Sequence, residues 1–160
     1  MGTTWIVCAN SSRARLFEVD PHGPHGVEEP REIGDYANPA ARQHERDLRS
    51  DAAGRYYGKG ERTEGHVAAK QDGFAEHETE RFAEHLRTEL DRARNEHRFG
   101  QLWIAAAPAF LGLMRRNFAK ELAALVEVEL DRDLTTASPR EIFTHLLDAR
   151  AAQRRHAGGG

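Results

Sequence analysis

Cysteine is nearly absent from this chain of 160 residues, in which Cys8 is the only thiol. One cysteine excludes an intramolecular disulfide framework and is typical of a reducing compartment. Because Cys8 lies inside an apolar run at residues 4–9, we expect it to be buried, and a buried thiol is inert. No serine stands in a Gly-x-Ser-x-Gly elbow either, so the sequence predicts no nucleophilic catalysis.

Long hydrophobic runs are also missing. No window approaches the roughly 18 apolar residues of a membrane-spanning helix. The first residues lack a basic leader region and carry only about six apolar residues before a polar cluster, too few for a secretory signal. We therefore expect a cytoplasmic protein without a membrane partner.

An excess of positive charge is absent as well. The formal net charge is -3, with charged residues at 31% and apolar residues at 39%. No global basic field is present, so contact with nucleic acid would require a local patch. The length predicts one domain over residues 1–150, and the basic, then glycine-only stretch 151–160 predicts a disordered tail.

The most informative stretch that is present is 101–116. Its apolar run at 102–107 has the length and character of a strand buried on both faces. Pro108 follows, and proline is well tolerated at the first position of a helix. Apolar residues then recur at helical spacing, namely Phe110, Leu111, Leu113, Met114 and Phe118. A buried strand that runs into a helix predicts an α/β layered domain.

The remaining elements follow from the same reasoning. Strands are predicted at 4–9 and 13–20, a marginal one at 27–33, where Pro30 favours an edge, and an edge strand at 125–130. A helix over 75–98 has an apolar stripe and ends before Gly100, and a Ser138–Glu141 capping box opens the last helix. The order is β-β-(β)-long loop-α-β-α-β-α, a mixed sheet with helices packed on it, antiparallel at the start and parallel later.

The segment 34–74 is predicted to be a long loop, mobile or functional, with a short helix at 40–48. Its basic and aromatic side chains are candidates for gripping RNA, because arginine and lysine contact phosphates while tyrosine stacks on bases. The candidates are Arg42, His44, Arg46, Arg49, Arg55, Tyr56, Tyr57, Lys59 and Arg62. Interleaved acidic residues leave the segment neutral, so a solvated loop is the alternative interpretation.

Two further sites are candidates. The helix that starts at Pro108 follows the carboxyl end of a strand, and its free N–H groups, with Arg115 and Arg116, are candidates for holding an anion. Ordinary strand-to-helix packing with solvated arginines is the alternative. The second is the polar turn Asn10, Ser11, Ser12 and Arg13, for which simple turn chemistry is the alternative.

Metal chemistry finds little support in the sequence. Residues that bear suitable ligands are scattered without a tight motif, namely His44, Asp47, Asp51, His66, Asp72 and His77. A ribonuclease-H-type enzyme needs clustered carboxylates on its strands, but the first strand ends in Asn10, and nothing places Asp20, Asp131 and Asp133 together. We expect no metal and no other cofactor.

Three pieces of the chain carry a resemblance to a known family: TWIVCANSSRARLFE from residue 4, HERDLRSDAAGR from residue 44 and APAFLGLMR from residue 107. Over roughly residues 4–147 the sequence resembles the bacterial host attachment family, although Ala109 stands where the family has a second proline. That family is in turn similar to the middle domain of archaeal and eukaryotic class-1 peptide-chain release factors. The resemblance implies a ribonuclease-H-like plan with a long loop before the longest helix.

The release-factor loop carries a Gly-Gly-Gln motif that acts in peptidyl-tRNA hydrolysis. Here the segment has Gly58-Lys-Gly-Glu and Lys70-Gln-Asp-Gly instead, so that reaction is not expected. The first hypothesis is a non-catalytic binding module that contacts the ribosome or tRNA. The second is an interaction protein with protein partners that acts indirectly in colonisation of host surfaces. The third is a metal-dependent hydrolase that uses His44 and Asp47.

Overall fold

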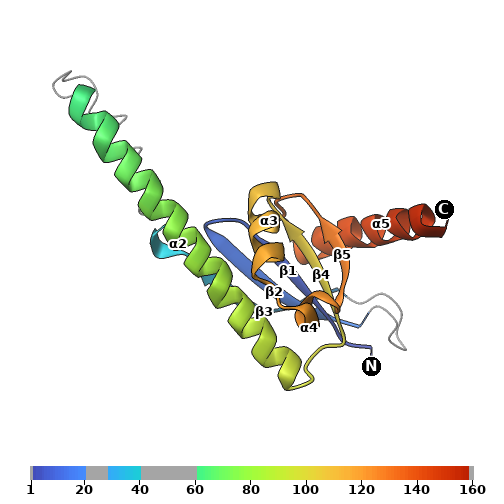
Figure 1. Ribbon diagram of the computed structural model, residues 1–160. Coiled ribbons are helices and arrows are strands. Elements are labelled where there is room, and N and C mark those ends of the chain that lie inside the picture. The colour runs from blue at the N-terminus through green and yellow to red at the C-terminus, as the bar shows by residue number, and fades with distance from the viewer. Residues whose placement is uncertain (1, 21–28, 41–60, 159–160) are drawn as a thin grey trace.

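The computed structural model describes residues 2–20, 29–40 and 61–158, and side chains in the helix that starts at residue 61 are described from residue 73 onward. A five-stranded sheet with strand order β3-β2-β1-β4-β5 forms the middle of the molecule (Figure 1). Its strands are β1 (Thr4–Ala9), β2 (Arg13–Val19), β3 (Arg31–Ala37), β4 (Gln101–Ala106) and β5 (Val126–Leu130).

The sheet is mixed, as the sequence predicts. The first three strands pair antiparallel, β1 with β2 and β2 with β3, whereas β1 pairs parallel with β4 and β4 parallel with β5. Every residue of β1 is buried, and so is every residue of β4 after Gln101. These two apolar runs therefore occupy the middle of the sheet, because only a central strand covered on both faces can bury consecutive side chains.

Helices cover both faces of the sheet. They are α2 (Glu61–Asn95), α3 (Pro108–Asn117), α4 (Lys120–Ala123) and α5 (Pro139–Gly158). Alternate strand residues point to opposite faces. Val7 and Ile104 pack on the side of α2, α3 and α4, whereas Ile6 and Trp103 pack on the side of α5, and the three layers are visible in Figure 1.

The start of the last helix is capped as predicted. The backbone N–H of Glu141 donates to the Ser138 hydroxyl oxygen at 3.2 Å, and that hydroxyl lies 3.1 Å from the Glu141 carboxylate. Ile142, Phe143 and Leu146 bury the same face of α5 against the sheet. The sequence was sufficient to predict the start of α5, because the capping box and the apolar stripe both depend on residues that are close together in the chain.

The predicted long loop at 34–74 is wrong at both ends. Its first residues belong to β3, which begins four residues later than the predicted strand at 27–33, and α2 begins at Glu61 instead of residue 75. The β3 edge strand is largely exposed and has no clear apolar alternation. The early part of α2 bears no regular apolar stripe, so the periodicity that reveals a helix is missing. Of the predicted short helix at 40–48, residues 41–48 lie outside the described residues.

Two further boundaries differ from the prediction. Helix α2 ends at Asn95 and not at residue 98, and His97 has a positive φ of 58° in the turn that follows. Residues 151–158 continue α5 and do not form the predicted disordered tail. Arg150 is the last buried side chain of α5, so the two exposed turns beyond it lack the apolar signal by which a helix is recognised.

No helix in the described part of the chain is both long enough and apolar enough to span a membrane.

Candidate functional site

The predicted polar turn between β1 and β2 is held by Asn10. Its side-chain oxygen accepts hydrogen bonds from the backbone N–H groups of Ser12 at 2.8 Å and Arg13 at 2.9 Å. This is the turn chemistry expected of asparagine. The Asn10 side-chain nitrogen donates across the molecule to Asp133 at 2.9 Å and to the Thr135 hydroxyl at 3.2 Å. The turn is thereby joined to the segment that follows β5.

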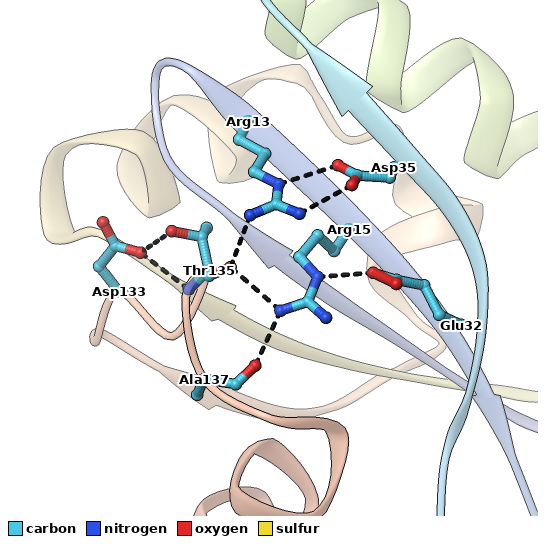
Figure 2. Close-up of polar contacts among 7 residues, drawn as sticks. All are labelled: Arg13, Arg15, Glu32, Asp35, Asp133, Thr135 and Ala137. Atoms are coloured by element: carbon cyan, nitrogen blue, oxygen red, sulfur yellow. Dashed lines mark hydrogen bonds and ion pairs between the residues drawn. The ribbon is translucent and has the colours of Figure 1, made fainter.

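Two arginines of β2 extend this connection (Figure 2). Arg13 donates to both carboxylate oxygens of Asp35, at 2.9 and 2.7 Å, and to the backbone oxygen of Thr135 at 3.3 Å. Arg15 pairs with Glu32 at 2.5 Å and donates to the backbone oxygens of Thr135 at 3.0 Å and Ala137 at 2.8 Å. Two guanidinium groups thus join β2, the edge strand β3 and residues 133–137.

Asp133 completes the cluster by accepting bonds from Thr135. The backbone N–H of Thr135 lies 3.0 Å from the Asp133 carboxylate, and its hydroxyl lies 2.6 Å away. Burial acts to raise the pKa of Asp133, but the hydrogen bonds from Asn10 and Thr135 outweigh it and hold that pKa below the usual aspartate value. We call this set the polar edge cluster: Asn10, Arg13, Arg15, Glu32, Asp35, Asp133 and Thr135. Its groups bind one another, which is the arrangement of a structural clasp.

The lowered pKa of Asp133 predicts acid sensitivity. An aspartate in the unfolded chain titrates near pH 3.9. The ionised carboxylate therefore stabilises the fold above about pH 4, and this contribution is lost as the pH falls through the lower folded-state value. In urea unfolding at pH 5 and at pH 2.5, we expect Asp133→Asn to lose less stability than the wild type. Asp131→Asn, at an exposed neighbour, serves as the control, and equal losses in all three proteins would contradict the assignment.

The two arginines of the predicted anion site at the start of α3 have different surroundings in the structure. Arg115 bonds the Glu129 carboxylate of β5 through both Nε, at 2.8 Å, and Nη2, so it is engaged away from the start of its helix. That ion pair and its hydrogen bonds raise the pKa of Arg115. Arg116 instead lines a cleft between α3 and α2. The two arginines therefore do not act together on one anion.

This cleft has a volume of about 620 Å³. We call it the α2–α3 cleft. One wall is formed by Glu76, Thr79 and Glu80 of α2, and the other by Phe110, Leu113 and Arg116 of α3. Ser11 of the polar turn closes one side, so this predicted residue does line a cavity.

Most of the predicted RNA-gripping residues lie outside the described residues, namely Arg42, His44, Arg46, Arg49, Arg55, Tyr56, Tyr57 and Lys59. Arg62 lies in the first turn of α2. Within residues 2–20, 29–40 and 61–158, no group of three or more histidine, cysteine or acidic side chains is arranged to hold a metal ion.

Cys8 is buried, which confirms the expectation. Its side chain has no exposed surface, and burial raises the pKa of the thiol to about 12, with a smaller opposing effect from Arg15. At neutral pH the thiol is therefore protonated and unreactive.

Sequence reasoning missed most of the polar edge cluster. Arg15, Glu32 and Thr135 were not singled out, and Asp133 was named only as a carboxylate that nothing placed. Arg15 and Ala137 are far apart in the chain, so no local spacing reveals their contact. The one usable signal was Asp133 followed two residues later by Thr135, a pattern in which the aspartate bonds its own backbone.

Comparison with known proteins identifies one family. The sequence model for the family described as "Protein required for attachment to host cells" matches residues 5–146. That range includes β1 from its second residue, the other four strands, the polar edge cluster and the first part of α5. No curated protein matches the chain.

Proposed function

The chain belongs to the family of proteins required for attachment to host cells, and we propose that it acts as a non-catalytic binding module in the cytoplasm that contacts the ribosome or tRNA. The observation that carries this proposal is the projecting half of α2 (Figure 1). We call residues 61–81 the arm, because the first buried side chain described in α2 is Phe82.

The arm is long relative to the body. At about 1.5 Å per residue it extends roughly 30 Å before α2 reaches the hydrophobic core. Helices in proteins owe most of their stability to packing against a neighbour. Residues 75, 76, 79 and 80 of the arm line the α2–α3 cleft, and Glu78 and Arg81 line a second hollow together with residues 35–39. None of the described side chains at 73–81 is buried. A projecting helix of this kind is suited to contact with another macromolecule.

Local positive charge supports a nucleic-acid partner. Residues 151–158 form the exposed end of α5 and carry Arg154, Arg155 and His156. The basic residues predicted to grip RNA precede the arm in the sequence, and Arg62 lies in its first turn, at the end of α2 farthest from the sheet (Figure 1). Neutralising phosphates with such side chains releases counterions and makes binding sensitive to salt.

The likeness to the release-factor middle domain and its ribonuclease-H-like plan is part of the proposal. The order of elements supports it, since three antiparallel strands precede the longest helix, which is followed by parallel β4 and β5. The polar edge cluster does not favour catalysis, because its carboxylates and arginines are engaged with one another. The metal-dependent hydrolase based on His44 and Asp47 gains no support from the described residues.

Sedimentation tests the proposal. At low salt we expect the protein to migrate with ribosomal particles in a sucrose gradient, and at high salt to return to the top. Arg154→Glu combined with Arg155→Glu is expected to lower the bound fraction roughly tenfold, because both phosphate contacts become repulsive. Replacing Arg46, Arg55 and Lys59 by alanine should also weaken binding.

The matched control is Arg140→Glu at the opposite end of the same helix, which we expect to sediment like the wild type. Migration as a small species at both salt concentrations would refute a ribosomal partner. Arg154→Glu alone changes the net charge by as much as Arg140→Glu does, so equal losses in these two single variants would assign the effect to overall charge.

A protein partner is the alternative, and Phe74 favours it. Phe74 lies on the arm with 58% of its surface exposed, the one large apolar side chain so exposed in the described part of the chain. Next to it, Glu76 and Glu80 give the wall of the α2–α3 cleft a negative charge that phosphates would avoid. In this alternative the protein supports attachment indirectly by binding another protein.

Replacing Phe74 by serine tests the alternative. We expect attachment of the cells to host surfaces to fall, while the free energy of unfolding changes by less than about 0.5 kcal/mol, because an exposed side chain contributes little to the core. Glu84→Ala, at another exposed position of α2, should leave attachment unchanged. Normal attachment with Phe74→Ser would exclude this residue as a contact.

A further inference from the structure

The α2–α3 cleft is a groove with one helix along each side. Its α2 wall runs from Ala75 to Glu80, about 8 Å at 1.5 Å per residue. Beyond Glu80 the two helices meet where the rings of Phe82 and Phe110 pack, with centroids 6.0 Å apart. In the other direction α2 continues past the body of the molecule (Figure 1). Grooves of this kind recur in proteins that bind amphipathic helices.

The middle of the groove is apolar and has room for side chains. On α3, Phe110 is buried and Leu113 is half-buried, and Ala75 and Ala109 present only methyl groups to the space between the helices. The volume of about 620 Å³ lies within the range of ligand sites in proteins. Apolar side chains of an incoming segment would leave water here, which favours binding.

The α2 wall carries two negative charges that this chain leaves uncompensated. Glu76 and Glu80 are exposed, lie one helical turn apart, and take part in no ion pair among the described residues. Glu78 lies between them in the sequence but pairs with Arg81 and does not line the cleft. Like charges four residues apart repel each other, so a cation placed between them is favoured.

The α3 wall adds a single positive charge. The Arg116 Nη1 atom lies 3.7 Å from the position that a Cβ atom of Gly112 would occupy, so the guanidinium follows its own helix. No ion pair joins it to Glu76 or Glu80 on the facing wall, although all three line the cleft. The groove is therefore apolar in the middle and has a net charge of one carboxylate. A helix with an apolar ridge flanked by lysine or arginine complements it.

We propose that the α2–α3 cleft receives a basic amphipathic helix of another protein. Lysine or arginine side chains of that helix pair with Glu76 and Glu80, while its apolar side chains pack on Leu113. The proposal rests neither on the RNA contact nor on Phe74, which does not line the cleft. Helix α5 covers the opposite face of the sheet, so its basic end and the cleft can be occupied at the same time.

Two helical peptides test the proposal on the full-length protein. Each has about 18 residues, a ridge of leucines and a fluorescein label, and the ridge is flanked by lysine in one peptide and by glutamate in the other. Fluorescence anisotropy at about 0.15 M salt measures binding, because charges more than about 8 Å apart are then largely screened. We expect the lysine peptide to bind saturably with a dissociation constant on the order of 100 µM, since the groove contacts only a short length of helix. The glutamate peptide should bind at least several-fold more weakly.

Variants of the walls locate the site. Glu76→Lys combined with Glu80→Lys is expected to weaken binding of the lysine peptide roughly tenfold. The matched control is Glu84→Lys combined with Glu96→Lys, which changes the net charge equally at exposed positions outside the cleft and should alter the affinity by less than about twofold. Ala109→Trp, at an exposed position of the cleft, fills the groove and should abolish binding.

Three results would overturn the docking site. They are no saturable binding of the lysine peptide at millimolar concentration, equal losses in the two double lysine variants, and tighter binding of the glutamate peptide. Binding of a single-stranded RNA that is lost in Ala109→Trp would likewise overturn the proposal, because it would assign the cleft to nucleic acid. None of these measurements involves the ribosome, so this proposal and the RNA contact can each fail alone.

Discussion

Replacing Arg15 by methionine is expected to lower the free energy of unfolding by about 2 kcal/mol, because two backbone carbonyl oxygens lose a charged donor, whereas the exposed residue Glu32 can be solvated. The Arg15 side chain is 10% exposed, and methionine retains most of its apolar length. The substitution leaves Glu32 without its cation and deprives the backbone oxygens of Thr135 and Ala137 of their donor. Chemical unfolding in urea measures the loss.

Arg31→Met is the matched control for this result. Arg31 pairs with Glu18 at 2.7 Å in the same sheet, but its side chain is 73% exposed. Exposed pairs contribute about 0–1 kcal/mol, so the control should remain close to the wild type. Arg15→Lys is expected to fall between the two, because one ammonium cannot reproduce the fork that binds a carboxylate and two carbonyl oxygens. Equal losses for Arg15→Met and Arg31→Met would show that the polar edge cluster does not clasp the fold.

The second large effect is expected at Glu127. This carboxylate lies in β5, and its 21% exposed side chain pairs with Arg150 of α5 at 2.7 Å. It also accepts hydrogen bonds from Trp103 Nε1 at 3.1 Å and from Gln101 Nε2 at 2.6 Å. Glu127→Ala would leave a guanidinium that is 10% exposed without its carboxylate and a buried indole N–H without its acceptor. We expect a loss of about 3–5 kcal/mol in urea unfolding.

Glu129→Ala, two residues along the same strand, provides the comparison. Glu129 pairs with Arg115, whose side chain is 57% exposed, so its loss should cost about 1 kcal/mol or less. Glu127→Gln keeps an acceptor for Trp103 and should be milder than alanine. If Glu127→Ala and Glu129→Ala were equally stable, the ion pair between Glu127 and Arg150 would contribute no more to stability than the exposed pair between Glu129 and Arg115.

These two glutamates also show where sequence patterns stop being informative. Valine and glutamate alternate along β5, which predicts one wet face with both carboxylates on it, and the edge position of the strand is confirmed. The register shifts between Leu102 and Trp103, where Leu102 pairs with Val126 and Trp103 with Val128. Glu127 falls within this irregularity and reaches Trp103 and Arg150. Alternation alone cannot reveal such a shift, because it depends on the partner strand.

The mixed α/β architecture, the central strands β1 and β4, and the helix that starts at Pro108 were determined by the sequence alone. Their signals are local: a continuous apolar run, a proline at the first helical turn and a capping box each act within a few residues. Residues 61–74 of α2 were not predicted as a helix, because their sequence carries no regular apolar stripe.

Only the tertiary structure decided which polar residues meet. The segment after β5 comes beside the start of β2, so Arg15 contacts Ala137 and Asn10 contacts Asp133. Helix α5 packs against β5, so Glu127 contacts Arg150. Contacts between distant segments arise from packing of the whole chain, and no spacing within the sequence records them.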